Sequence, residues 1–279
     1  MLAVLGSPIA HSLSPVLHSS AYKTLGLDWN YESVDVTEAG LPSFLAALGD
    51  EWRGLSLTMP LKRAIVPLLD EHDDLVELTG VANTVLFDRN AASEQRTIRG
   101  FNTDVAGLMD VLGDAGADTS HAHVLGSGAT AASVIVALAR LGATSVTLSA
   151  RSPGKATALR QLAERLGLVL TIAPFGGAPA RELPLVISAV PGAAEIDFPI
   201  PASLPKAAVL LDIAYDPWPT PLAAAWSRAG GTIHSGLGML VCQALRQVRV
   251  FVHGDPERAL EGEPGLLNAM RNSVGLPVR

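Results

Sequence analysis

Residues 124–150 constrain the fold most, because they hold a single charged residue, Arg140, in a strand, helix, strand pattern. Parallel strands that helices cover on both faces are apolar along nearly their whole length. The first strand is followed by Gly126-Ser127-Gly128-Ala129-Thr130-Ala131, a Gly-x-Gly-x-x-Ala turn. In such a turn the two glycines allow a tight bend and close approach to a pyrophosphate, and the small third residue lets the helix pack on the sheet. The segment predicts a Rossmann-type nucleotide-binding unit, with an ordinary glycine-rich turn as the alternative.

The end of the next strand, expected at residues 145–150, indicates which nucleotide would bind. NAD-binding proteins place an acidic residue about 20 residues after the glycines, for the ribose 2′-hydroxyl. Here the sequence reads Ala150, Arg151 and Ser152, with Lys155 following. A guanidinium binds phosphate bidentately, and cations at a helix N-terminus favour a bound anion because they oppose the helix dipole. These residues predict NADP, with a solvated helix start as the alternative.

Short β-rich runs alternate with amphipathic helical segments along the rest of the chain, which is typical of parallel βαβ units and an α/β fold. We expect strands at residues 2–5, 29–36, 54–58, 82–87, 96–100, 185–190, 209–213 and 232–234. We expect a helix with Ser14 as its N-cap and Pro15 at its first position, and another capped by Ser152 and Pro153. Further helices are expected at residues 38–48, from residue 103, and from 237 to about 252. The length of 279 residues predicts about two domains.

Composition excludes several classes of protein. The chain is 48% hydrophobic, which excludes disorder, and its net charge of −7 argues against nucleic acid or an anionic membrane as a partner. No apolar run reaches the ~18 residues of a membrane span, and the N-terminus lacks the basic region of a signal peptide. The single cysteine, Cys242, fits a reducing cytoplasm. His121 and His123, with no Glu or Cys nearby, predict the polar lead-in to a strand and no metal site.

Three polar clusters follow predicted strands in the first 104 residues, at the sheet edge where open α/β folds bind ligands. They are Ser12-Leu13-Ser14, Thr58-Met59-Pro60-Leu61-Lys62, and Asn83-Thr84 together with Asn102-Thr103-Asp104. Each has a structural alternative: an N-cap for Ser14, a surface lysine for Lys62, a turn residue for Asn83 and a first-turn acid for Asp104. The acidic run at residues 70–74 predicts a solvated loop or a helix end.

Five motifs occur in order: residues 6–15, residues 58–62, Val81-Ala82-Asn83-Thr84, Asn102-Thr103-Asp104, and Gly236-Leu237-Gly238-Met239-Leu240. With the glycine-rich turn, they closely resemble the shikimate dehydrogenase family from residue 3 to about residue 252. The resemblance implies a cytoplasmic oxidoreductase of the shikimate pathway of aromatic amino-acid biosynthesis, which reversibly reduces 3-dehydroshikimate to shikimate with NADPH. It implies two α/β domains with a cleft between them: a substrate-binding domain at residues 1–104 and 239–279, and a Rossmann-type NADP-binding domain at residues 105–238. It leaves a monomer or a homodimer open.

Site residues follow from the same resemblance, position by position. Lys62 and Asp104 match the catalytic pair, whose lysine supplies a proton or stabilises charge on the substrate oxygen. The residues that match substrate-binding positions are Ser12 and Ser14 for the carboxylate, Tyr215 near it, and Thr58, Asn83 and Gln243 for the ring substituents. The residues that match cofactor-binding positions are Gly126, Ser127, Gly128, Ala129, Ala150, Arg151, Ser152, Lys155, Ala189, Val190, Ile213, Gly236 and Met239.

Three departures from the family pattern affect details of this prediction. Ser56 stands where the family usually has Asn, Ser235 replaces Asp or Asn, and residues 188–192 replace an Asn-Ala-Thr run beside the nicotinamide. The alternative enzyme is a quinate/shikimate dehydrogenase that uses NAD, whose relatives often carry Thr or Gly at Ser14 and an acidic residue in the cofactor strand. A regulatory nucleotide-binding module is a third hypothesis, against which the intact Lys62 and Asp104 argue.

Overall fold

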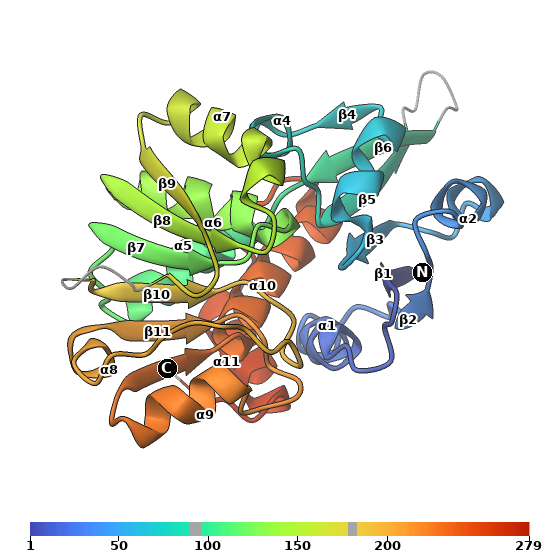
Figure 1. Cartoon of the computed structure of the whole chain (residues 1–279). Helices are drawn as coiled ribbons and strands as arrows, with labels where there is room; N and C mark the ends of the chain where they lie inside the picture. The colour runs from blue at the N-terminus through green and yellow to red at the C-terminus, as the bar shows by residue number, and fades with distance from the viewer. Residues whose placement is uncertain (90–95, 178–182, 279) are drawn as a thin grey trace. The chain divides into compact units, whose positions relative to one another are not determined.

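Two separate sheets organise the chain in the computed structural model, which describes residues 1–89, 96–177 and 183–278 (Figure 1). Unit 1 consists of Met1–Gly107 and Leu240–Arg279, and unit 2 consists of Leu108–Met239. Within the described ranges, each unit holds one sheet of six strands. Every helix in those ranges is too short or too polar to pass through a lipid bilayer.

The sheet of unit 1 has the strand order β2-β1-β3-β5-β6-β4. Its strands are β1 (Leu2–Gly6), β2 (Tyr31–Asp35), β3 (Gly54–Leu57), β4 (Glu71–His72), β5 (Thr84–Arg89) and β6 (Arg96–Phe101). The expectation of parallel strands throughout is wrong here, because β5 runs antiparallel to both β3 and β6. β5 and β6 follow each other closely in the chain and therefore pair antiparallel, since a parallel pair needs a long crossover.

The helices of unit 1 come from both ends of the chain. They are α1 (Ser14–Thr24), α2 (Leu41–Ala47), α3 (Leu61–Ala64), η1 (Val66–Leu68), α4 (Asp74–Thr79), the start of α5 (Asp104–Asp114), most of α10 (Leu237–His253), and α11 (Glu263–Ser273). The expected N-cap at Ser14 is wrong: Leu13 occupies that position without a side-chain hydrogen bond, and Ser14 is the first residue of the helix. In the acidic run, Asp73 caps α4 by accepting a hydrogen bond from the backbone of Val76 at 2.7 Å.

Alternate residues of β1 supply two apolar cores, one on each face of the sheet. Leu2 and Val4 belong to a cluster with side chains of α1, α10 and α11. Ala3 and Leu5 belong to a second cluster with Leu41 of α2 and with side chains of β3 and α3. The C-terminal helices therefore complete the core that the first strand begins.

Unit 2 has the parallel strand order β12-β11-β10-β7-β8-β9. Its strands are β7 (His121–Leu125), β8 (Ser145–Ala150), β9 (Val169–Pro174), β10 (Leu185–Ser188), β11 (Val209–Asp212) and β12 (Thr232–Ser235). Its helical segments include α6 (Ala129–Arg140), η2 (Pro153–Lys155), α7 (Thr157–Arg165), α8 (Leu204–Ala207) and α9 (Pro221–Arg228). The chain starts in the middle at β7 and adds strands on either side, which is the order of the doubly wound Rossmann fold and confirms that prediction.

Two local predictions in unit 2 are wrong. His121 and His123 lie within β7 and not ahead of it, and His123 is buried beside Ser149 at 2.9 Å. The helix expected at Ser152 starts only at Thr157, after the three-residue 3₁₀ turn η2, which contains a glycine of low helix propensity. The helix-dipole argument for a nearby anion therefore loses its geometric basis, while the bidentate chemistry of the guanidinium remains.

Candidate active site

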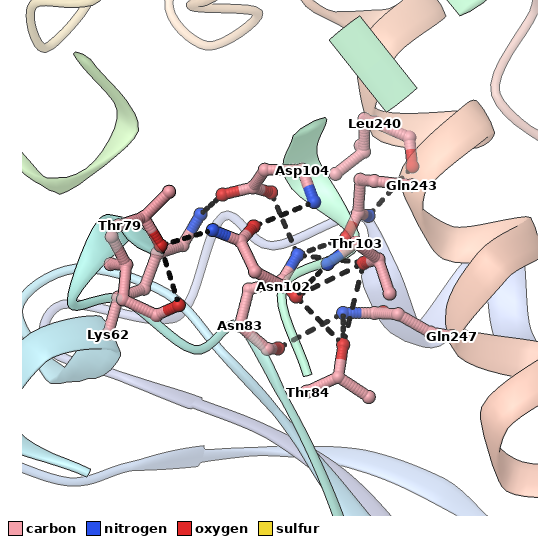
Figure 2. A network of polar contacts seen from close by, with 11 residues as sticks. Lys62, Thr79, Asn83, Thr84, Asn102, Thr103, Asp104, Leu240, Gln243 and Gln247 are labelled. Atoms are coloured by element: carbon pink, nitrogen blue, oxygen red, sulfur yellow. Dashed lines mark hydrogen bonds and ion pairs between the residues drawn. The ribbon is translucent and has the colours of Figure 1, made fainter. Parts of the chain in front are cut away.

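A buried ion pair joins Lys62, at the second position of α3, to Asp104, the first residue of α5. The Lys62 Nζ donates to Asp104 Oδ2 at 2.6 Å (Figure 2). The lysine side chain is 14% exposed and the aspartate side chain 4%, so water screens the pair little. A charge-assisted bond in this setting holds the ammonium in one direction, and removing either partner would leave a poorly solvated charge.

The segment before α5 is fixed by its own side chains. Asn102 Oδ1 accepts from the backbone of Asp104 at 3.2 Å, and its amino group donates to Thr79 Oγ1 at 3.0 Å. The backbone of Asn102 donates in turn to Asp73 Oδ2 at 3.2 Å. Burial raises the pKa of Asp73, although the backbone hydrogen bonds to its carboxylate counteract this. Thr79 and Asp73 therefore hold Asn102, and Asn102 in turn holds the backbone of Asp104.

Asn83, just before β5, connects the ion pair to the C-terminal helix α10. Its Oδ1 accepts from the backbone of Thr103 at 2.9 Å, and its amino group donates to Asp104 Oδ1 at 2.8 Å. The same amino group lies 3.2 Å from Gln243 Oε1, on α10. The result is a cation, a carboxylate and two amides within one hydrogen-bonded group (Figure 2), a set that can bind hydroxyl groups and protonate a carbonyl oxygen.

The other predicted substrate residues of unit 1 lie at or just before the start of α1 and directly after β3. Ser12 Oγ accepts from the backbone of Ser14 at 3.3 Å, and Ser14 is 5% exposed. Thr58 follows β3 and donates its backbone N–H to the carbonyl oxygen of Leu5 at 2.9 Å. Its own carbonyl oxygen accepts at 2.8 Å from the backbone N–H of Leu61, the first residue of α3. Tyr215 follows β11 and belongs to unit 2.

The glycine-rich turn of unit 2 has the shape that its sequence predicts. Gly126 has φ +103°, and a Cβ there would lie 3.0 Å from the carbonyl oxygen of Ala189. Gly128 is the N-cap of α6 and has an extended backbone conformation, and Ala131, in the first turn of α6, is fully buried. The helix begins at Ala129 beside the end of β7, where the strand order reverses. Such a turn leaves backbone N–H groups at a helix N-terminus open to phosphate.

The remaining predicted cofactor residues follow the neighbouring strands. Ala150 ends β8 and is buried, whereas Arg151 and Ser152 after it are exposed. Lys155 ends η2. Ala189 and Val190 follow β10, and Ile213 follows β11. Gly236 follows β12, and a Cβ there would lie 1.7 Å from the carbonyl oxygen of Ile213. Met239, in α10, is buried. These residues fit a dinucleotide, because they line the carboxyl edge of the parallel sheet.

Sequence reasoning missed Gln247, which contacts the group around Asn83. Its amino group donates to the Asn83 carbonyl oxygen and to Thr84 Oγ1, both at 3.1 Å (Figure 2). Gln243 and Gln247 stand four apart on α10, so they lie on one face of that helix. Two glutamines four residues apart on an otherwise apolar helix face are the sequence pattern that could have indicated Gln247 as a buried polar residue near the site.

Comparisons with known proteins identify the family of this chain. Residues 4–85 match the family model described as the shikimate dehydrogenase substrate binding domain. A shikimate dehydrogenase (NADP(+)) of Rubrobacter xylanophilus is 33% identical, over 94% of this chain and 96% of its own length. The Mycobacterium tuberculosis shikimate dehydrogenase structure is 40% identical, covers 98% of both chains and has a TM-score of 0.78. The Thermus thermophilus enzyme, solved in complex with NADP(H) and shikimate, is 33% identical over 98% of both chains, with a TM-score of 0.77. The chain belongs to the shikimate dehydrogenase family.

Proposed function

We propose that this protein is an NADP-dependent shikimate dehydrogenase that catalyses the reversible reduction of 3-dehydroshikimate to shikimate. The observation that carries the proposal is the Lys62–Asp104 pair at 2.6 Å, buried among the amides of Asn83 and Gln243. Relatives at 31 to 35% identity are named shikimate dehydrogenase (NADP(+)). The single cysteine, which is buried, suits the reducing cytoplasm where we place the enzyme.

Unit 2 would hold the cofactor and unit 1 the substrate. The pyrophosphate would lie on the residues of the glycine-rich turn, Gly126, Ser127, Gly128 and Ala129. The exposed Arg151 would bind the 2′-phosphate, supported by Ala150, Ser152 and Lys155. The nicotinamide would lie beside Ala189, Val190, Ile213, Gly236 and Met239. When bound, NADPH supplies a hydride to the carbonyl carbon of the substrate.

Lys62 acts on the carbonyl oxygen. Reduction of a ketone leaves negative charge on that oxygen, which must be protonated or stabilised in the transition state. One N–H of the ammonium is committed to Asp104 Oδ2, which fixes the direction of the other two. Asp104 is a hydrogen-bond acceptor for the ammonium and for a ring hydroxyl of the substrate. The pair therefore orients the substrate and supplies the positive charge where it is needed.

Recognition of the substrate rests mainly on neutral groups. Ser12 and Ser14 bind the carboxylate through their hydroxyls, with Tyr215 near it, and Thr58, Asn83 and Gln243 bind the ring substituents. This choice explains how a chain with a net charge of −7 takes two anionic ligands. Hydroxyls, amides and backbone N–H groups bind anions without the cations that a surface patch would require.

Initial rates with shikimate and quinate, each with NADP and with NAD, test the proposal. We expect the highest kcat/KM with shikimate and NADP, because Ser14 is intact and Arg151 directly follows the cofactor strand β8. Faster turnover of quinate with NAD would replace the proposal with the quinate/shikimate dehydrogenase. Turnover of neither acid by protein that still binds NADP would favour the regulatory nucleotide-binding module.

A further inference from the structure

A second buried polar cluster lies next to the Lys62–Asp104 group in unit 1. Its members are His18 and Tyr22 of α1, Tyr31 of β2, Ser56 of β3 and Gln247 of α10. Each is at most 8% exposed, and His18 is fully buried, with its ring stacked on that of Tyr31 at 4.0 Å. Burying five polar side chains is unfavourable unless they are hydrogen-bonded.

The hydrogen bonds of this cluster run in one direction. Tyr31 donates its hydroxyl to Ser56 Oγ at 2.7 Å, and Ser56 donates to Gln247 Oε1 at 2.8 Å. His18 Nε2 lies 3.1 Å from the same oxygen, and Nδ1 lies 2.9 Å from the Tyr22 hydroxyl. Because Gln247 Oε1 only accepts, Nε2 carries the proton, and Tyr22 donates to Nδ1. Two donors therefore fix the orientation of the Gln247 amide.

Through its amino group, Gln247 connects this cluster to Asn83 and so to Asp104. Ser56 and Thr84 pair across β3 and β5, so one side chain from α10 reaches both strands. The Gln247 amino group donates to the Asn83 carbonyl oxygen and to Thr84 Oγ1, so Thr84 donates its own proton to Asn83 Oδ1 at 2.9 Å. With its oxygen occupied, Asn83 turns its amino group to Asp104 Oδ1.

We propose that Gln247 is a positioning residue for the reaction, and that Ser56 orients Gln247 and does not bind substrate. The Ser56 hydroxyl accepts from Tyr31 and donates to Gln247, and the residue is 3% exposed, so its proton and one lone pair are used inside the protein. This role rests on the proposed function, because it acts through Asn83 on the Asp104 that holds Lys62. It explains how the chain functions with serine where the family usually has asparagine.

Gln247→Met tests the role, because methionine has a similar length and shape but cannot donate to Asn83 or Thr84. We expect kcat with shikimate and NADP to fall by roughly 10- to 100-fold, the range that a misplacement of about 1 Å produces. The KM for NADP should stay within about twofold. The deuterium isotope effect with labelled shikimate should rise, because hydride transfer becomes slower than product release. A structural role alone would leave that isotope effect unchanged.

Val248→Ala is the matched control, since Val248 is fully buried on the same helix and belongs to the apolar core. It should lower the melting temperature by opening a cavity, while kcat stays within about twofold. An equal loss of kcat in Val248→Ala and Gln247→Met would overturn the proposal. So would a Gln247→Met enzyme that keeps its kcat and its isotope effect.

Ser56→Ala tests the same path, by itself where Gln247→Met does not fold and in combination with Gln247→Met where it does. Alone it should lower kcat by about two- to fivefold, since Gln247 then keeps one of two orienting donors. Combined with Gln247→Met it should add nothing further, and losses that multiply would show two independent roles and refute the path. Inactive wild-type protein would refute the proposed function instead. In that case the Asn83 side-chain amide signal in a ¹⁵N NMR spectrum still tests whether Gln247 orients this amide. The signal should shift in Gln247→Met and in Ser56→Ala. An unchanged signal in both variants would refute the path.

Discussion

Acidification below about pH 6.5 should destabilise unit 1 through His18. This ring is fully buried and stacked on Tyr31, and its two nitrogens are hydrogen-bonded to Tyr22 and Gln247. Burial lowers the pKa of His18 to about 3, while the hydrogen bond to Gln247 counteracts part of this effect. Protonation of Nδ1 would also remove the acceptor that the Tyr22 hydroxyl uses. The folded state therefore keeps the ring neutral.

The sign follows from linkage. The folded pKa lies below the unfolded value of about 6.5, so the unfolded chain takes up this proton first as the pH falls. The stability contributed by the neutral ring is complete above pH 6.5 and is lost progressively down to about pH 3. One proton corresponds to about 1.4 kcal/mol per pH unit, and the unfolded ring is half protonated at pH 6.5, so the free energy of unfolding should drop by about 1.6 kcal/mol between pH 6.5 and 5. Burial raises the pKa of Asp73, which acts in the opposite direction at the acid end of this range.

Urea unfolding at half-unit steps from pH 6.5 to 5, followed by circular dichroism, measures this slope in the wild type and in His18→Asn. The variant is less stable at every pH because it loses the stacked ring, but its slope should be shallower, by about 0.7 kcal/mol per pH unit at pH 6.5 and about 1.3 kcal/mol per pH unit at pH 5. His123 of unit 2, whose pKa burial lowers to about 4, contributes equally to both proteins and cancels in the difference. Equal slopes in the two proteins would refute the reasoning.

Three further changes have definite expected outcomes. Lys62→Ala should lower kcat by about 10²- to 10⁴-fold with a much smaller change in the KM for shikimate, and a change in KM alone would mean that Lys62 only binds. Arg151→Asp should raise the KM for NADP at least about tenfold and leave the KM for shikimate unchanged, whereas an unaltered KM for NADP would remove its assigned role. Ser56→Asn should cost about 1 to 3 kcal/mol of stability by overpacking against Tyr31 and Gln247, as measured by thermal unfolding, and unchanged stability would contradict the packing described here.

Unit 2 could be predicted well because its central strands are buried on both faces and are therefore apolar along their length. Its edge strand β9 was missed, because Val169 is 65% exposed and the strand carries no buried run. In unit 1 the apolar run of β5 was found, but not its direction, since burial leaves the same pattern in parallel and antiparallel strands. The helix α11 was missed because its apolar face is narrow and it begins after the left-handed Gly262 without a side-chain cap.

The motifs named the residues around Lys62 but not how they are held. A short motif indicates which side chains follow a strand, but not which of them contact each other. In the structure, Lys62, Asn83, Asp104 and Gln243 form one hydrogen-bonded group. The order of hydrogen bonds behind them depends on contacts between residues far apart in the chain. Gln247 meets Ser56 across 191 positions and His18 across 229, so no local pattern could predict either contact.

The departure at Ser56 shows why such contacts matter for interpreting a family motif. Taken by position, the serine reads as a weakened substrate contact, because its side chain is shorter than asparagine and carries one polar atom. In the structure that atom is committed to Tyr31 and Gln247, and the amide that faces the catalytic group belongs to Gln247. Gln247 donates to the backbone of Asn83 and to Thr84. With serine at position 56, the amide next to the catalytic group is therefore on helix α10 and not on strand β3. A departure at one motif position therefore has to be judged with the helix residue that packs against it.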